Sequence, residues 1–210
     1  MESLDELLGK AEAAHGHLCA GLILGVRMAL LGLERLGIQD PREADRKRLV
    51  TYVEIDRCAT DAIVLVTGCR LGKRALKFRD WGKMAATFVN LATGRAIRIV
   101  ALENSRELAA ERFPEIESKA EQQKMAYREL TDGQLFREQW VTVELPPREL
   151  PGYKGGRVTC PECGEGVNFD RFVERAGADG QQVRLCLSCA DPALRYWHPA
   201  EDEDSAEKQD

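Results

Sequence analysis

The chain has 210 residues, of which 44% are hydrophobic and 31% are charged, and its formal net charge at pH 7 is −5. This composition is typical of a globular protein, and the length suits one medium domain with a small appendage or two small domains. No apolar stretch is long enough to span a bilayer, and the first residues are acidic where a signal peptide would be basic. We therefore expect a cytoplasmic protein without a membrane partner, and its negative charge gives no overall attraction to nucleic acid.

The distribution of cysteine and proline predicts how the chain is divided. Seven cysteines in a reducing compartment indicate metal or thiol chemistry rather than disulfides. Three prolines between positions 146 and 151 predict a stiff linker, because proline suits neither a helix interior nor a central strand. We therefore expect a core domain at 1–145, a linker at 146–156, a four-cysteine domain at 157–198 and a disordered acidic tail at 199–210.

Apolar spacing predicts the elements of the core domain in chain order. A long helix is expected over 18–36, ended by Gly37 and Pro41. The predicted elements that follow are a strand over 49–55, a short helix over 61–66, strands over 84–91 and 95–102 joined as a hairpin, helices over 105–112 and 114–130, and a strand over 135–145. This mixed order predicts an α+β fold in which a long N-terminal helix accompanies a small sheet, and there is no internal repeat.

A dense group of metal-ligand side chains precedes the long helix. His15, His17 and Cys19 fall within five residues, and neutral imidazole and thiolate are preferred ligands of zinc and similar divalent metals. Cys19 is expected at the N-terminal end of the helix, where the helix dipole favours the thiolate. The alternative is a buried thiol beside a hydrogen-bonded histidine. We predict a metal site here.

A second metal site is predicted after the linker, where two Cys-x-x-Cys pairs are separated by residues 164–185. Four thiolates complete a tetrahedral zinc site without an open position, which favours a structural role. A segment this short needs the metal to fold, and the spacer is expected to hold a hairpin or a short helix. A redox dithiol is the weaker interpretation, and contact with nucleic acid is less expected than contact with protein. The predicted ligands are Cys160, Cys163, Cys186 and Cys189.

Three later stretches, 56–62, 67–73 and 80–85, accompany the first cluster. The glycine-rich stretch 67–73 ends in lysine, but it lacks the spacing of a nucleotide-binding P-loop. Together these segments resemble the FmdE family, which takes its name from a component of formylmethanofuran dehydrogenase, over roughly residues 10 to 145. The four-cysteine segment resembles a zinc-finger appendage that some members carry. The matching residues are His15, Gly16, His17, Leu18, Cys19, Ala20, Gly21 and Gly25, then Cys58, Asp61 and Ala62, then Thr67, Gly68, Cys69, Gly72 and Lys73, and finally Gly82 and Lys83. Ala20 and Arg70 depart from the family, which often has proline and threonine there.

The resemblance implies an α+β core that forms an intertwined homodimer, with a divalent metal, taken as zinc, in an open cleft. It makes His17, Cys19 and Cys58 the first choice of ligands, with His15 and Cys69 in reserve. Asp61 is expected to orient a ligand or move a proton, with a helix cap as the alternative, and Lys73 and Lys83 to neutralise an anionic ligand. The residues expected to act in a reaction are Cys19, Cys58, Asp61 and Lys73.

The leading hypothesis is an FmdE-like protein whose open core site binds a small molecule or performs thiolate–metal chemistry, beside a structural zinc finger. A non-enzymatic metal carrier or sensor is the first alternative, and a regulator that uses the finger on protein or nucleic acid is the second. The chain shows no signal for holding the molybdopterin or tungstopterin that the family name suggests.

Overall fold

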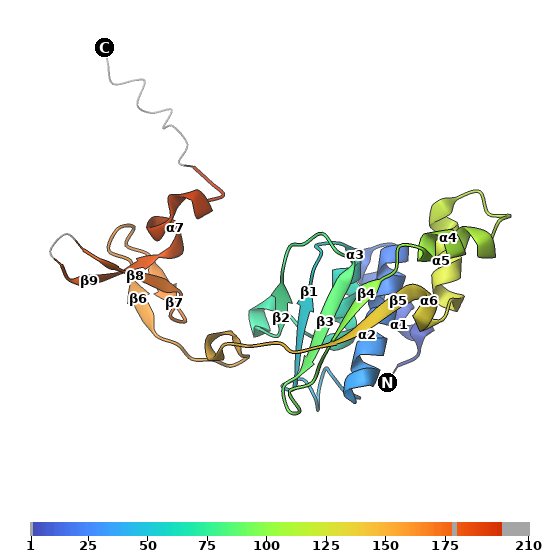
Figure 1. Cartoon of the computed structure of the whole chain (residues 1–210), viewed down its shortest axis with the longest axis horizontal. Helices are drawn as coiled ribbons and strands as arrows, with labels where there is room; N and C mark the ends of the chain where they lie inside the picture. Colours follow the sequence, from blue (N-terminus) through green and yellow to red (C-terminus); the bar gives the residue numbers. More distant parts are fainter. Residues whose placement is uncertain (1, 178–179, 199–210) are drawn as a thin grey trace, which may run out of the picture. The chain divides into compact units, whose positions relative to one another are not determined.

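The computed structural model describes residues 2–177 and 180–198, and the chain divides into two compact units, Met1–Gly152 and Tyr153–Asp210 (Figure 1). The division falls inside the segment 146–156 that the sequence predicts as a linker. Helices combine with a five-stranded sheet in the first unit, and two small hairpins carry a four-cysteine cluster in the second, which confirms the α+β fold class. The tail expected at 199–210 lies outside the described residues. None of the described helices has the length and apolar character that a membrane crossing requires.

The first unit follows the predicted order with several additional elements and shifted ends. Its elements are α1 (Leu4–His15), α2 (Ala20–Leu36), β1 (Leu49–Val53), α3 (Cys58–Thr67), η1 (Leu71–Lys73), β2 (Leu76–Phe78), β3 (Ala85–Asn90), β4 (Ala96–Ala101), α4 (Ser105–Arg112), α5 (Lys119–Glu129), α6 (Asp132–Leu135), β5 (Phe136–Val141) and η2 (Pro147–Glu149). Helix α1 and strand β2 have no counterpart in the prediction. Helix α3 begins three residues earlier than expected, and this shift makes Cys58 its first helical residue.

One face of the sheet carries the helices and the main core. The strand order is β2-β1-β3-β4-β5, with β1 and β2 parallel and the other pairs antiparallel. Figure 1 shows α1, α2 and α3 gathered on one side of this sheet. Phe88, Ile97 and Ile99 of β3 and β4 are fully buried in the same cluster as the apolar residues of α2. Burial of these side chains against a helix that is apolar on most of its surface supplies the main stabilisation of the unit.

The other face of the sheet is covered by a single extended segment that follows β5. Val143 and Leu145 of this segment pack on a small cluster centred on Val50, Val89 and Ala96. Further along, the Lys77 ammonium on β2 donates a hydrogen bond of 2.5 Å to the Glu149 carbonyl. Since β5 and β2 are the two edges of the sheet, the segment 142–149 crosses the whole face, and we call it the strap.

The second unit is built from short elements around its cysteines. Strands β6 (Arg157–Thr159) and β7 (Gly166–Asn168) form one antiparallel hairpin, and β8 (Phe172–Ala176) and β9 (Gln182–Cys186) form another. The short helices α7 (Leu187–Ala190) and η3 (Pro192–Leu194) follow. Its buried core is small and includes Cys160 and Cys186 themselves. A unit with so little buried apolar surface depends on a cross-link or a metal for stability.

Candidate metal centres

The first cluster forms where two parallel helices begin. Helices α2 and α3 lie so close together that a Cβ added to Gly25 would be 2.4 Å from the Ala59 carbonyl oxygen and 2.8 Å from Ala62 Cβ. One turn earlier, a Cβ on Gly21 would be 3.4 Å from Cys58 Cβ and 3.7 Å from Cys19 Sγ. These glycines thus let the N-terminal ends of both helices lie side by side. Cys19 at the start of α2 and Cys58 at the start of α3 are therefore neighbours.

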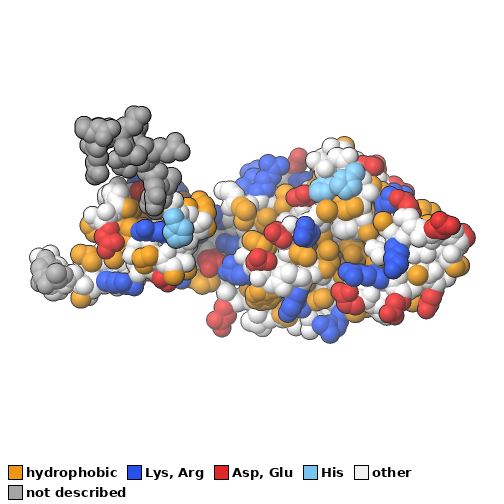
Figure 2. Space-filling model, turned by 90° about the horizontal axis from the view of Figure 1, so that it is seen from above, with side chains coloured by type: hydrophobic (Ala, Val, Ile, Leu, Met, Phe, Trp, Pro, Cys, Tyr) orange, Lys and Arg blue, Asp and Glu red, His pale blue; other side chains and the backbone are white. Residues whose placement is uncertain are grey.

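The chain reaches these helix ends through a tight turn that groups the histidines. Helix α1 ends at His15, and Gly16 adopts the left-handed conformation with φ of 96°, which suits a residue without a Cβ. The turn brings the His15 and His17 rings to a centroid separation of 5.0 Å. The potential ligand atoms of His15, His17 and Cys19 all lie within 4.8 Å of one another. His17 is exposed and His15 is partly exposed, and histidine side chains appear on the surface of the first unit in Figure 2.

Hydrogen bonds fix two of these three groups. His15 Nδ1 lies 2.9 Å from Asp61 Oδ2, which leaves Nε2 as the ring nitrogen available to a metal. A carboxylate behind a ligating imidazole is a common arrangement, because it sets the tautomer and the ring orientation. Cys19 is the N-cap of α2, and its Sγ accepts the Leu22 amide hydrogen at 3.4 Å. The sulfur therefore lies at the N-terminal end of a 17-residue helix, which carries the positive end of the helix dipole.

Cys58 lies beside Cys19, but it does not belong to the group of three residues whose ligand atoms lie within 4.8 Å of one another. Burial raises the pKa of the Cys58 thiol, and hydrogen bonding and charge repulsion from Cys19 raise it further. A bound cation would oppose this shift, because a coordinated thiol is deprotonated. Cys58 also lines a cavity of about 390 Å³ together with His15, Asp61 and three residues that the sequence analysis did not single out, Asp56, Arg57 and Thr60.

Two predicted residues do not reach this cluster. Cys69 follows the C-terminal end of α3, so the ten residues of the helix, roughly 15 Å in length, separate it from Cys58. The Cys69 thiol is buried, accepts a hydrogen bond from the Thr51 hydroxyl at 3.5 Å and lies 3.7 Å from the Leu49 carbonyl. Lys73 is close enough to Cys69 to lower its pKa, which burial otherwise raises. Both expectations, Cys69 as a reserve ligand and Lys73 as an acting group, are therefore not supported by their positions.

The remaining two predicted residues are placed as follows. The Lys83 ammonium lies 5.6 Å from the centre of the Trp81 ring, on the loop before β3. Asp61 is in the first turn of α3 and contacts His15, whereas the N-cap position belongs to Arg57. The helix-cap alternative for Asp61 is thus replaced by a contact with a potential metal ligand.

The second cluster gathers the four cysteines of the Tyr153–Asp210 unit, whose sulfur atoms all lie within 4.8 Å of one another. The backbone N–H groups of Cys186 and Cys163 lower the pKa of Cys160 to about 6, whereas the Cys186 side chain raises the pKa of Cys189 to about 12. The opposed shifts show that four thiols at this separation compete for negative charge. A bound dication removes that competition, since a coordinated thiol is deprotonated outright.

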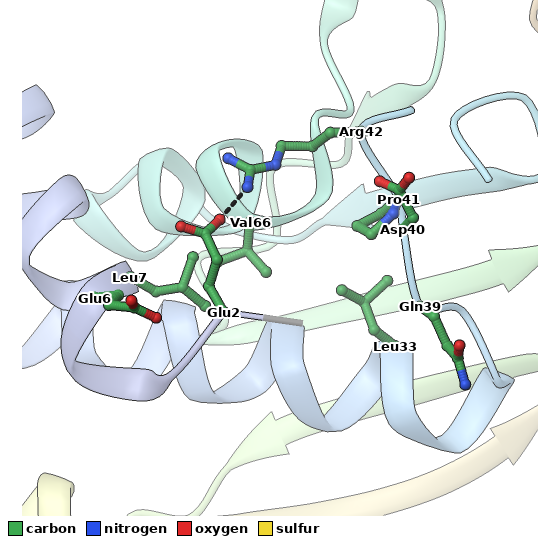
Figure 3. A pocket seen from close by; sticks show the side chains of 9 residues that line it. All are labelled: Glu2, Glu6, Leu7, Leu33, Gln39, Asp40, Pro41, Arg42 and Val66. Carbon is green, nitrogen blue, oxygen red and sulfur yellow. Dashed lines mark hydrogen bonds and ion pairs between the residues drawn. The ribbon is translucent and has the colours of Figure 1, made fainter. Parts of the chain in front are cut away.

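The chain has a further cavity, of about 480 Å³, that contains none of the predicted site residues (Figure 3). It lies between the start of α1 and the segment after α2, and Leu7, Leu33 and Val66 give it apolar walls. Its Arg42 and Glu2 side chains form an ion pair, and Lys10 also pairs with Glu2. We assign it no chemistry.

The fold and the two clusters define an α+β protein with two groups of potential metal ligands. A family model described as "FmdE, Molybdenum formylmethanofuran dehydrogenase operon" matches residues 14–142, more than half of the chain. The chain belongs to the FmdE family, as the motifs at residues 15–25, 58–62, 67–73 and 82–83 indicate.

Two known proteins extend this comparison beyond the family region. A protein of Archaeoglobus fulgidus named "Probable S-adenosyl-L-methionine-binding protein" is 31% identical over 208 residues, which cover 89% of this chain and 53% of that protein. The chain thus spans about half the length of this curated relative. A crystal structure of a tungsten formylmethanofuran dehydrogenase FmdE-like protein from Syntrophus aciditrophicus superposes with a TM-score of 0.61. That match has 23% identity and covers 92% of this chain and 95% of the other, so it supports the fold alone.

Proposed function

We propose that the protein binds a divalent metal, taken as zinc, at the cluster of His15, His17 and Cys19, and that this site takes up a small ligand. One observation carries the proposal: three side chains with the donor atoms that zinc prefers lie within 4.8 Å of one another at the surface of the unit. Cys58 stands next to the cluster as a fourth candidate ligand. Three ligands leave a position for water or substrate, as in catalytic zinc sites.

The residues around the metal would have distinct tasks. Asp61 holds His15 through Nδ1 and so directs Nε2 towards the metal. A bound metal would make a coordinated water or thiol more acidic, and we propose that Cys58, which neighbours Cys19, carries a proton to or from the site. The cavity beside His15 and Cys58 gives a small molecule room to approach.

The four-cysteine cluster is proposed as a structural zinc site. Its four sulfurs occupy all the positions of a tetrahedral ion, and the unit around it has only a small core. In this unit the exposed Leu187, Leu194 and Tyr196 favour a protein partner over nucleic acid. Homodimer formation and a cytoplasmic location belong to the same proposal, and sedimentation equilibrium of the full chain tests the former.

Cobalt(II) replacement of the metal tests the core site directly. Thiolate-to-cobalt charge-transfer absorption reports sulfur ligation, so Cys19→Ala should remove part of the absorption of the fully loaded chain. Cys69→Ala is the matched control, because Cys69 is a buried cysteine of the same unit that lies away from the cluster. Equal spectra for Cys19→Ala and the unaltered chain would refute ligation by Cys19.

A metal carrier is the second candidate, and the exposure of His17 favours it because an exposed ligand exchanges readily. Its test is the rate of metal transfer to a chelator. A carrier should release the metal of the first cluster rapidly and keep the metal of the four-cysteine cluster. A protein with a catalytic first cluster should keep both metals. The name of the Archaeoglobus relative makes S-adenosyl-L-methionine the first small ligand to titrate into the loaded protein. Its amino and carboxylate groups can occupy open positions on a metal, and calorimetry with and without metal measures that contribution.

A further inference from the structure

A cavity of about 330 Å³ lies on the sheet face opposite α1, α2 and α3, and none of the residues of the first cluster lines it. Its floor is a row of side chains paired across three neighbouring strands: Tyr52 on β1, Thr87 on β3 and Arg98 on β4. Paired residues of neighbouring antiparallel strands project from the same face, so these three side chains lie next to one another. The volume is within the range of about 300–1,000 Å³ that small-molecule sites occupy.

The walls of this cavity are mostly apolar or aromatic. On one side the beginning of the strap contributes Val143 and, at the rim, the exposed Glu144, next to Val141 at the end of β5. On the other side the loop before β3 contributes Trp81, which is 60% exposed although it is a large aromatic residue. Backbone hydrogen bonds from Arg79 to Val53 and from Trp81 to Glu54 hold this loop against the end of β1. The aromatic wall is therefore presented on an anchored segment.

The charged groups of the floor are already neutralised by one another. Arg98 donates to both Glu54 oxygens at 2.6 Å, and its remaining terminal nitrogen donates to Gln139 at 2.8 Å. Glu54 is only 3% exposed, so this pair is held within the sheet face rather than offered to solvent. The Arg79 guanidinium lies 5.5 Å from the centre of the Tyr52 ring and 3.6 Å from the Glu149 carboxylate. A floor of this kind gives little attraction to a bare ion.

The floor also carries the Thr87 hydroxyl. Thr87 is only 6% exposed, and its hydroxyl makes no hydrogen bond to any residue in the described part of the chain. Thr87 lines the cavity, so its hydroxyl can pair with water or with a bound molecule. The hydroxyl can both donate and accept, which suits a ring nitrogen or an exocyclic amine.

From this combination we infer that the cavity binds an uncharged, planar nitrogen heterocycle. The ring places a nitrogen against the Thr87 hydroxyl and packs its face or edge on Trp81, while Val141 and Val143 bury its other side. A neutral floor, apolar walls and a hydroxyl in the lining favour such a ring over an anion, a metal ion or an aliphatic chain. The site is separate from the cluster of His15, His17 and Cys19, and the inference does not depend on the proposed function.

Calorimetric titration of the full chain with adenosine, an uncharged purine nucleoside, tests the inference. Saturable binding is expected, with the same affinity in the presence of a chelator that strips the core metal. Thr87→Val, which keeps the shape but removes the hydroxyl, should weaken binding about 2- to 12-fold, the equivalent of one net hydrogen bond. Thr87→Ser retains the hydroxyl and should bind within about 2-fold of the unaltered chain.

The aromatic wall has its own matched pair of variants. Trp81→Leu should weaken adenosine binding about 5-fold or more, since a base stacked on an aromatic ring gains a substantial part of its affinity from that contact. Trp140→Leu is the control: it also removes a half-exposed tryptophan, but Trp140 pairs with Ile97 and therefore lies on the helix-covered face. Absence of saturable binding would overturn the inference, as would equal affinities for Thr87→Val and Thr87→Ser. Self-association of the unaltered chain that Trp81→Leu abolishes would also overturn it, because a second copy would then cover this face.

Discussion

Gly25→Ala tests how the contact between α2 and α3 builds the first cluster. The added Cβ would be 2.4 Å from the Ala59 carbonyl oxygen, 2.7 Å from Ala59 Cα and 2.8 Å from Ala62 Cβ. Packed atoms approach to about 3.5 Å, so the helices must separate locally by roughly 1 Å. Overpacking of this kind costs about 1–3 kcal/mol, and the higher helix propensity of alanine returns about 1 kcal/mol. We expect a net loss of up to about 2 kcal/mol in the free energy of unfolding, together with weaker metal binding.

The affinity for the metal should fall, because Cys19 and Cys58 lie at the starts of the two helices that move apart. Metal–ligand distances tolerate changes of only about 0.2 Å, much less than the helix separation that the added methyl group would impose. The assays are urea unfolding and competition with a chromophoric chelator. Gly9→Ala in α1 is the control, since a Cβ there meets nothing within 4 Å and should raise stability by up to about 1 kcal/mol. If Gly25→Ala is as stable as Gly9→Ala and binds metal equally well, the close helix contact does not shape the site.

Three further predictions concern the sheet, an acidic turn and the end of α5. Arg98→Met should lower the free energy of unfolding in urea by about 3–5 kcal/mol, because it leaves the Glu54 carboxylate buried without its partner. The double variant with Glu54→Gln should recover part of that loss, whereas an additive loss would contradict the pairing. The backbone N–H groups of Asp40 and Gln39 lower the pKa of Asp45 below its ordinary value of 3.8, so the carboxylate stabilises the fold above that pH and stops doing so as the pH falls through the lowered pKa. Asp45→Asn should therefore lower Tm at a pH of about 6 more than at a pH of about 2, and a gap in Tm that does not change with pH would contradict this. The Arg27 guanidinium donates to the last carbonyls of α5, so Arg27→Met should accelerate amide exchange there while exchange in the sheet stays slow; uniform acceleration would indicate global destabilisation instead.

The sequence predicts the elements of the core best where apolar spacing is regular. The long helix predicted over 18–36 is α2, Ala20–Leu36, and the predicted hairpin corresponds to β3 and β4. Helix α1 is absent from the prediction, although Ser3 and Glu6 form a capping box that marks its start. Strand β2 has only three residues, and its parallel pairing with β1 depends on contacts that no local pattern encodes.

The candidate site is only partly predictable for a similar reason. Local spacing identifies His15, His17 and Cys19 because a five-residue turn is enough to group them. Cys58 lies beside Cys19 only because Gly21 and Gly25 let two helices pack in parallel, and the sequence shows the glycines without the contact.

Two other residues show how the fold decides what a sequence pattern leaves open. Cys69 follows Cys58 by eleven positions and is an equally suitable ligand by residue type, yet the length of α3 carries it to the other end of the helix. The place of Thr87 in the lining of a cavity depends on pairing across strands and leaves no signal in the sequence. Both positions are set by tertiary contacts rather than by local spacing.

We expect the chain to hold two metal ions at separate clusters, one open and one structural. Metal content per chain, measured by elemental analysis of the full-length protein and its variants, tests this most directly. We predict two equivalents for the unaltered chain, one for Cys19→Ala, one for Cys163→Ala and none for the double variant, with two retained by Cys69→Ala. Two equivalents in Cys19→Ala, or one in the unaltered chain that only Cys163→Ala removes, would contradict a metal site at the helix ends.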